Sequence, residues 1–360
     1  MPYLITSLKL GLSICWKCLA GGVQAMLKER IITLRELSNF GSVSGLNDQA
    51  VALVRQQQKT WEVAQKNYAM LLNAQTKTFK FGHFEIKVQH NPERIRSSAA
   101  KTDAKSIAGR ACFLCLENLP PEQKGIMFRN KYLILTNPYP IFPFHLTISM
   151  LKHTPQRIGI FFPDMLDLSR ELAGFSLLYN GPQSGASAPD HFHFQAGNKG
   201  FLPVETEVKI LENRNEANVL FQNEKTTIIA AENYLRRFIV LSSSDESEIV
   251  RFFQCFYSIL PARRGNEPML NILCNYERGR WRVIVFPRER TRSSHFYQTG
   301  DKQVIVGPAT VELGGVLVLP RYKDFLSVDC QIISEIYEEV TLSSSLFEQW
   351  LDISMDSIGK

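Results

Sequence analysis

The residues from 191 to 197 read His-Phe-His-Phe-Gln-Ala-Gly, and they carry the clearest chemistry in the chain. Polar and aromatic residues alternate here, which is typical of a strand with one polar face. Because successive side chains of a strand point to opposite faces, His191, His193 and Gln195 are expected on one face and the two phenylalanines in a core. A neutral imidazole can act as a nucleophile, a proton carrier or a metal ligand. An amide can donate a hydrogen bond to a phosphoryl oxygen as charge builds there.

The segment before this motif, from Tyr179 to Asp190, is rich in glycine and serine. Small residues let backbone N–H groups approach an anion closely. The segment is therefore expected to cradle phosphate groups beside the histidines, with Asn180, Gly185 and Ser187 as candidate substrate-binding residues. A surface strand that happens to carry two histidines is the plainer alternative.

Two cysteines and two histidines could form a metal site. Cys112 and Cys115 form a Cys-x-x-Cys pair, His153 follows 38 residues after Cys115, and His191 follows 38 residues after His153. Structural zinc often has two thiolate and two imidazole ligands. The spacing is too long for a recognised zinc finger but is compatible with a site assembled across neighbouring strands. From the residues alone, packing and redox roles for the cysteine pair stay open.

The composition bounds the class of protein. The chain has 360 residues, of which 44% are hydrophobic and 21% charged, which indicates one large or two medium globular domains. Its net charge of +6 fits an anionic substrate, and the scattered basic residues do not require nucleic acid. An odd number of cysteines, seven, argues against a disulfide framework and for a reducing compartment, so the protein is expected to be cytoplasmic.

One polar segment and one apolar segment each have more than one interpretation. Residues 91–111 predict a long loop, in which Arg94, Arg96 and Lys101 either contact phosphate or form a solvated basic surface. Residues 4–25 are apolar but interrupted by lysines, and their uncharged stretches are too short to span a bilayer. They form either a signal peptide or an extension before a start at Met26, and the cysteine pair within them, Cys15 and Cys18, is interpreted as accidental.

Periodicity predicts an α+β chain of antiparallel sheets and packed helices in two related halves. The predicted domains are a doubtful extension (1–25), a helical region (26–75), a catalytic half (76–205) and a second half (206–360). Helices are predicted over 26–75, from Pro163 to Asn180, from a cap at Asp245 with Glu248, and from about 329. A hairpin is predicted over 77–90, and strands over 132–136, 145–150, 238–241, 269–275, 281–286, 303–306 and 315–319.

The His-x-His-x-Gln pattern resembles the transferase branch of the histidine triad superfamily. Similarity to GDP-L-galactose phosphorylases within it continues over 137–158 and 179–196, and at Phe286-Pro287, Gly307-Pro308-Ala309, Glu312, Gly314 and Lys323-Asp324-Phe325. The stretch from Cys112 to Gln123 resembles a largely uncharacterised bacterial family of the same superfamily. The resemblance covers about 110–350 and implies a histidine-triad-like fold.

Galactose-1-phosphate uridylyltransferases are a second similar family. That resemblance implies that Cys112, Cys115, His153 and His191 bind a structural zinc ion. This chain departs from those enzymes at Asp190 and Phe192, where they carry prolines or small residues, and the departure bears on the substrate.

The resemblance also implies a reaction. His193 would attack the α-phosphorus of a nucleoside-diphosphate sugar, and Gln195 would hold the α-phosphate oxygens. A covalent nucleotidyl-histidine divides one difficult transfer into two easier ones. We expect a GDP-hexose phosphorylase whose partners are the nucleotide sugar and phosphate, with no nucleic acid and no membrane. A dinucleoside polyphosphate phosphorylase and a catalytically silent nucleotide-binding protein are the alternatives.

Overall fold

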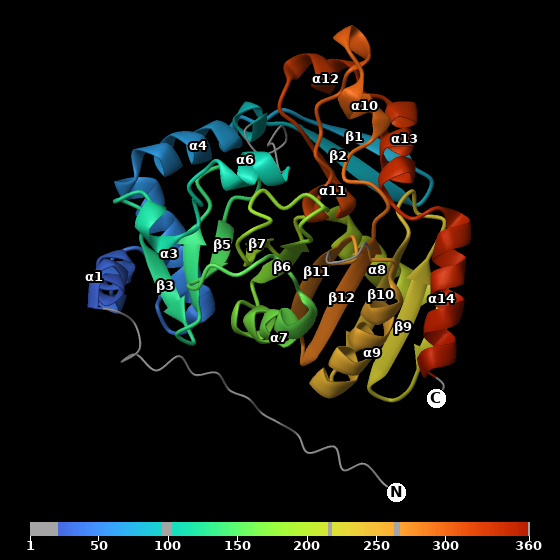
Figure 1. Cartoon of the computed structure of the whole chain (residues 1–360), viewed down its shortest axis with the longest axis horizontal. Helices are drawn as coiled ribbons and strands as arrows, with labels where there is room; N and C mark the ends of the chain where they lie inside the picture. The colour runs from blue at the N-terminus through green and yellow to red at the C-terminus, as the bar shows by residue number, and fades with distance from the viewer. Residues whose placement is uncertain (1–20, 96–102, 215–217, 263–266, 359–360) are drawn as a thin grey trace, which may run out of the picture.

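The computed structural model of the protein describes residues 21–95, 103–214, 218–262 and 267–358 (Figure 1). Among these residues, no helix is long and apolar enough to cross a membrane. The N-terminal part, predicted as one helical region, consists of α1 (Gly21–Arg30), α2 (Leu34–Leu37), α3 (Leu46–Thr60) and α4 (Glu62–Leu72). Short helical segments in the connections are η2 (Pro92–Arg94), α6 (Ala104–Ala108), η3 (Leu116–Asn118), η4 (Gly159–Phe161), α10 (Ser294–Tyr297) and η5 (Gly300–Lys302).

A ten-stranded sheet passes through both halves of the molecule (Figure 1). Its strands lie in the order β3-β4-β5-β7-β6-β11-β12-β10-β9-β8, and each neighbouring pair is antiparallel. Their bounds are β3 (Gly125–Phe128), β4 (Tyr132–Thr136), β5 (His145–Met150), β6 (Phe175–Asn180), β7 (His193–Asn198), β8 (Asn218–Gln222), β9 (Thr226–Ala231), β10 (Phe238–Ser243), β11 (Leu270–Glu277) and β12 (Arg280–Pro287).

The sheet is made of two halves with the same topology. The first half has three strands, then α7 (Phe162–Glu171), then β6 and β7, which lie in the order β3-β4-β5-β7-β6. The second half repeats this pattern with three strands, α9 (Glu246–Ile259), β11 and β12, in the order β8-β9-β10-β12-β11. The halves join where β6 pairs with β11. The predicted α+β fold with two related halves is confirmed, and β12 occupies the place in the second half that β7 has in the first.

One hydrophobic cluster joins the sheet to α3, α7, α9 and α14 (Ser344–Ile358). Phe192 and Phe194 are fully buried in it, as the alternation predicts. The predicted cap of α9 is confirmed, because the carboxylate of Asp245 accepts hydrogen bonds from the backbone N–H groups of Ser247 and Glu248. The burial of Phe192 and Phe194 places the apolar side of β7 in a core and leaves the other side of the strand for polar chemistry.

A second cluster covers the opposite side of the second half. It contains residues of α8 (Pro203–Arg214), β13 (Val316–Leu319), α11 (Thr310–Leu313), α12 (Tyr322–Ser327) and α13 (Cys330–Val340). The predicted hairpin, β1 (Thr76–Phe81) and β2 (Phe84–His90), lies here, because β13 pairs in parallel with β2. A segment placed by sequence in the catalytic half is thus joined to the C-terminal residues.

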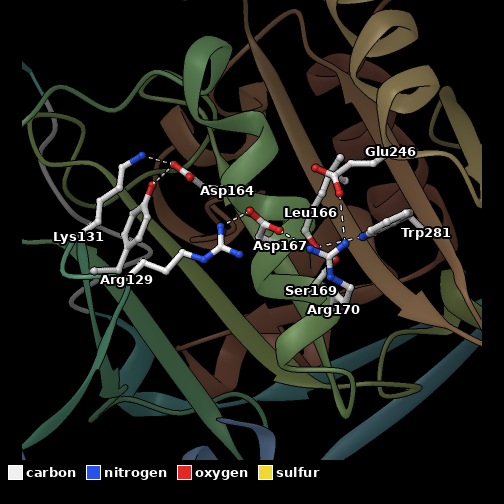
Figure 2. Close-up of polar contacts among 10 residues, drawn as sticks. Arg129, Lys131, Asp164, Leu166, Asp167, Ser169, Arg170, Glu246 and Trp281 are labelled. Carbon is white, nitrogen blue, oxygen red and sulfur yellow. Dashed lines mark hydrogen bonds and ion pairs between the residues drawn. The ribbon is translucent and has the colours of Figure 1, made fainter. Parts of the chain in front are cut away.

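Helix α7 is tied to both halves by polar contacts (Figure 2). Its Asp164 contacts Lys131 and Tyr132, and its Asp167 contacts Arg129, all from the β3–β4 hairpin. On the other side, the indole of Trp281 in β12 donates a hydrogen bond to the carbonyl of Leu166 at 3.0 Å, and Arg170 contacts Glu246 of α9.

The structure corrects two predictions of secondary structure and adds strands that were not predicted. The helix predicted to reach Asn180 ends at Glu171, and residues 175–180 form β6 instead, because they pair with β7 and β11 in the sheet. Residues 303–306 form no strand, although Val304 and Val306 are buried. Strands β3, β8 and β9 were not predicted. Short apolar segments fit either period, and the sheet neighbours decide between them.

Candidate active site

The polar side of β7 forms the floor of a pocket of about 640 Å³. His193 and Gln195 line it together with Thr147, which lies opposite Gln195 on β5. The walls include Arg94, Arg110, Phe113, Tyr139, Ser187 and Trp61. The pocket therefore combines the predicted nucleophile and amide with two guanidinium groups and several aromatic rings.

The tautomer of His193 follows from one hydrogen bond. Its ring Nδ1 lies 2.8 Å from the backbone carbonyl oxygen of His191. A carbonyl oxygen only accepts, so Nδ1 carries the proton and Nε2 keeps its lone pair. Burial lowers the pKa of His193 to about 4, so the ring is neutral at physiological pH. His193 thereby has one ring nitrogen, Nε2, with a lone pair, which is the state that the predicted nucleophile requires.

The orientation of Gln195 is fixed by His145, which sequence analysis did not single out as a site residue. The backbone N–H of Ile141 donates to His145 Nδ1 at 3.2 Å, so the proton of the ring is on Nε2. That nitrogen lies 3.0 Å from the side-chain oxygen of Gln195 and donates to it. Burial, together with the nearby positive charge of Arg94, lowers the pKa of His145 to about 3. With its oxygen engaged, Gln195 has its NH₂ group available to an anion in the pocket.

Gln156, which sequence analysis also did not single out as a site residue, holds the backbone of the predicted nucleophile His193. Its side-chain oxygen accepts a hydrogen bond from the N–H of His193 at 2.8 Å. Its side-chain nitrogen donates to the carbonyl oxygens of His193 at 2.9 Å and Asn180 at 3.0 Å. Nothing in the sequence marks this buried glutamine, because its role depends on three segments that meet only in the fold.

The predicted substrate-binding residues separate into three groups. Arg94 and Ser187 line the pocket, and Arg94 donates to the carbonyl of Tyr139 at 3.1 Å. Asn180 instead faces the second half: its side-chain oxygen accepts from Asn271 at 2.8 Å and from the backbone N–H of Thr310 at 2.9 Å.

Gly185 also contacts the second half. It has a φ of +95°, and a Cβ added there would lie 2.6 Å from the Cβ of Ala309. Only glycine fits this close approach without strain. Arg96 and Lys101, the remaining candidates, lie outside the described residues.

The four predicted metal ligands come together beside the pocket. Their ligand atoms all lie within 4.8 Å of one another. Cys112 Sγ is 3.3 Å from His191 Nδ1, and Cys115 Sγ is 3.1 Å from His153 Nδ1. A tetrahedral zinc ion with Zn–S of about 2.3 Å and Zn–N of about 2.0 Å separates sulfur from nitrogen by roughly 3.5 Å. The cluster can therefore bind a metal ion.

The outer contacts of the cluster suit a metal as well. His191 Nε2 lies 2.7 Å from the carbonyl oxygen of Met150, so it carries a proton and leaves Nδ1 free as a ligand. His153 Nε2 lies 3.6 Å from Asp190. His191 precedes β7 rather than belonging to it, and its ring meets the cysteines while His193 lines the pocket.

The second half has a strand, β12, that corresponds to β7 but carries apolar residues where β7 carries His193 and Gln195. Val283 and Val285 of β12 lie in the first cluster with Phe192 and Phe194, so Ile284 and Phe286 face the side that corresponds to His193 and Gln195. Both are buried among apolar side chains. The nucleophile-bearing strand β7 thus has an apolar counterpart.

Comparisons with known proteins agree with this geometry. Residues 53–198 match the family model described as domain of unknown function DUF4922, and residues 210–360 match the model described as GDPGP1-like, C-terminal domain. No curated protein matches the chain. The second match agrees with the predicted resemblance to the transferase branch of the histidine triad superfamily.

Solved structures share the fold. The yeast Ap4A phosphorylase Apa2 is 16% identical, with a TM-score of 0.52 over 79% of this chain and 97% of that chain. Apa2 in complex with AMP is 18% identical over 78% of this chain and 95% of that chain, with a TM-score of 0.51. Apa2 in complex with Ap4A has a TM-score of 0.50 at 14% identity, over 79% and 97% of the two chains.

Proposed function

We propose that the protein is a nucleoside-diphosphate-hexose phosphorylase that works through a nucleotidyl group on His193. One observation carries this proposal: the free Nε2 of His193 and the NH₂ of Gln195 belong to the same strand face in a pocket with two arginines. A neutral imidazole, an oxyanion donor and cations are the groups that phosphoryl chemistry requires.

The reaction has two displacements at one phosphorus. The lone pair of His193 Nε2 forms a bond to the α-phosphorus, and the bond from that phosphorus to the bridging oxygen breaks, releasing hexose 1-phosphate. An oxygen of inorganic phosphate then attacks the same phosphorus. The phosphorus–nitrogen bond breaks, its electron pair returns to Nε2, and the nucleoside diphosphate leaves. The Nδ1 proton stays on the ring throughout, held by the carbonyl of His191.

The base in the proposal is guanine. The match of residues 210–360 to the GDPGP1-like C-terminal domain supports a GDP-hexose as substrate, with phosphate as acceptor. A second candidate is a phosphorylase of dinucleoside polyphosphates, which is favoured by the shared fold with Apa2, solved with Ap4A bound. Both candidates use the same nucleophile and differ in the leaving group.

We also propose that the metal of the Cys112, Cys115, His153 and His191 cluster is zinc in a structural role. Two thiolates and two imidazoles are a common ligand set for structural zinc. Zinc there would fix the turn before β7 and the cysteine turn that forms the pocket wall. The residues of this chain, not the metal, perform the transfer.

A substrate panel tests the function. The protein is incubated in turn with GDP-, UDP- and ADP-sugars or Ap4A, first without and then with phosphate, and intact mass spectrometry detects a covalent nucleotide. We expect a guanylyl adduct from a GDP-hexose without phosphate and its conversion to GDP when phosphate is added. Release of UDP or ADP but never GDP would refute guanine while leaving the mechanism in place. An adduct from none of them would refute the transferase reaction.

A further inference from the structure

Arg110 lies at the pocket beside the nucleophile, and no step so far uses it. It stands between α6 and Cys112, and it lines the pocket with His193 and Gln195. Its guanidinium donates to the carbonyl oxygen of Ser187 at 2.8 Å and lies 5.1 Å from the centre of the Phe113 ring. These contacts hold the charged group at the pocket wall.

Arg110 and its partner Asp190 form a loose ion pair in which polar atoms of both side chains stay unpaired. The Nη2 atom of Arg110 is 3.6 Å from an oxygen of Asp190, which is longer than a hydrogen bond. Arg110 Nε and Asp190 Oδ1 are both buried, and neither has a hydrogen-bond partner among the described residues. Buried polar atoms are nearly always paired, so the unpaired Nε leaves the Arg110 guanidinium with a donor that its protein contacts do not use.

The two pocket arginines flank the nucleophile from opposite sides. Arg94 is held at Tyr139, close enough to His145 to lower its pKa, and so lies toward Gln195. Arg110 is held at Ser187 and Asp190, next to the metal ligand His191. A diphosphate that places its α-phosphorus at His193 would then have a guanidinium on each side. A planar guanidinium suits phosphate oxygens, which it can contact with two donors.

We propose that Arg110 is a phosphate-binding residue, on the metal-loop side of His193, for the nucleotide that the enzyme transfers. This inference rests on the proposed function. In the complex, Arg110 donates to phosphate oxygens while Asp190 and the Ser187 carbonyl keep its orientation. Asp190 also lies 3.6 Å from the metal ligand His153, so the metal cluster, whose cysteines lie in the metal loop (residues 112–115), and the phosphate site share one carboxylate.

The test compares ligands that differ only in phosphate. Binding of guanosine, GMP and GDP is measured for the full-length protein and for Arg110→Met and Arg110→Lys. We expect Arg110→Met to weaken GMP and GDP by about tenfold to a hundredfold, the range for a charge-assisted contact, and to leave guanosine unchanged. Arg110→Lys should restore part of the loss, because it keeps the charge but not the two-donor geometry.

A matched control and folding checks accompany the variants. Arg251 lies on α9 with its guanidinium 4.2 Å from the Phe252 ring, so Arg251→Met removes a comparable contact on an element that does not line the pocket. Thermal unfolding and metal content show that each variant is intact.

Three results would overturn the inference or its basis. Unchanged binding of GMP and GDP by Arg110→Met would show that Arg110 does not contact phosphate. An equal loss for guanosine would show that it only shapes the wall. Wild-type protein that binds no nucleotide in this series, or in the uridine and adenosine series, would refute the proposed function itself, which separates that failure from a failure of Arg110.

Discussion

At the scale of single residues, the proposed chemistry depends on two neutral imidazoles, those of His193 and His145. The backbone carbonyl of His191 sets the proton of His193 on Nδ1, and the backbone N–H of Ile141 sets the proton of His145 on Nε2. The first arrangement exposes a lone pair, and the second turns the amide of Gln195. Fixed backbone groups thus decide what each ring can do, which costs no reorganisation during the reaction.

Replacement of the nucleophile should separate chemistry from folding. We expect His193→Ala to abolish the covalent adduct and turnover, because no other nitrogen replaces Nε2, while thermal unfolding stays close to wild type. Gln195→Ala should slow turnover by about a hundredfold or more, as for the loss of one oxyanion donor. His83→Ala, at the exposed turn between β1 and β2, is the control. Turnover of His193→Ala at the wild-type rate would disprove the mechanism.

Glu267 predicts a dependence of stability on pH. Burial raises its pKa from 4.5 to about 7, although Tyr179, Tyr257 and the N–H of Ile158 donate to it. Between pH 4.5 and about pH 7, the Glu267 carboxyl holds its proton in the native state and has released it in the unfolded chain. The free energy of unfolding therefore falls as the pH rises from about 4.5 to 7, by up to roughly 3 kcal/mol.

Urea unfolding at pH 5, 6, 7 and 8 measures this dependence. Glu267→Gln does not titrate, so its profile should be flatter, and above pH 7 it should be at least as stable as wild type. Glu338→Gln, at an exposed position on α13, should keep the wild-type slope. Equal slopes for wild type and Glu267→Gln would show that Glu267 does not titrate in this range.

At the scale of elements, the metal loop joins three segments that are distant in sequence. Its cysteines meet His153 after β5 and His191 before β7, while Phe113 and Leu114 between them line the pocket. A metal ion there would fix the pocket wall and the entry to β7 together, since the same short turn serves both.

Elemental analysis and unfolding test this loop. We expect about one equivalent of zinc per chain, and we expect Cys112→Ser or Cys115→Ser to lose it and to unfold at a lower temperature, because metal binding is coupled to folding. Cys330→Ser, at an exposed cysteine, should change neither. Metal-free protein with unchanged stability and activity would remove zinc from the account.

At the scale of the whole molecule, the second half supports the site of the first. Asn271 and Thr310 hold the side chain of Asn180, whose carbonyl is bonded to Gln156, and Gln156 holds the backbone of His193. The half without the His-x-His-x-Gln motif therefore supports the pocket, and the position of His193 depends on residues far along the chain.

The N-terminal segment should be dispensable up to Met26. Leu27 is buried, and Arg30 donates to the carbonyl oxygens of Leu119 and Pro120, so a chain that begins at Met26 keeps these contacts of α1. We expect this shortened protein to be stable and fully active in unfolding and turnover assays. Aggregation or loss of activity would show that residues before Met26 pack into the fold. A chain that begins at Ile31, without these contacts, should be less stable.

The sequence allowed prediction of features that depend on neighbouring residues. Alternation places Phe192 and Phe194 in the core and His193 and Gln195 on the polar face, because period two is a property of the strand itself. The cap at Asp245 is equally local. Asn180 shows the limit: its loop suggests phosphate binding, but its side chain faces the second half.

By itself, then, the sequence determined which strand carries the chemistry and which thiols and imidazoles form the cluster. Only the tertiary structure decided which nitrogen of each histidine is free, that His145 turns Gln195, that Gln156 holds His193, and that Arg110 lies at the pocket. Residue type and spacing specify a side chain and the face it occupies. Proton positions and partners depend on strand register and on loops that meet across the sheet, and these are set by packing of the whole chain.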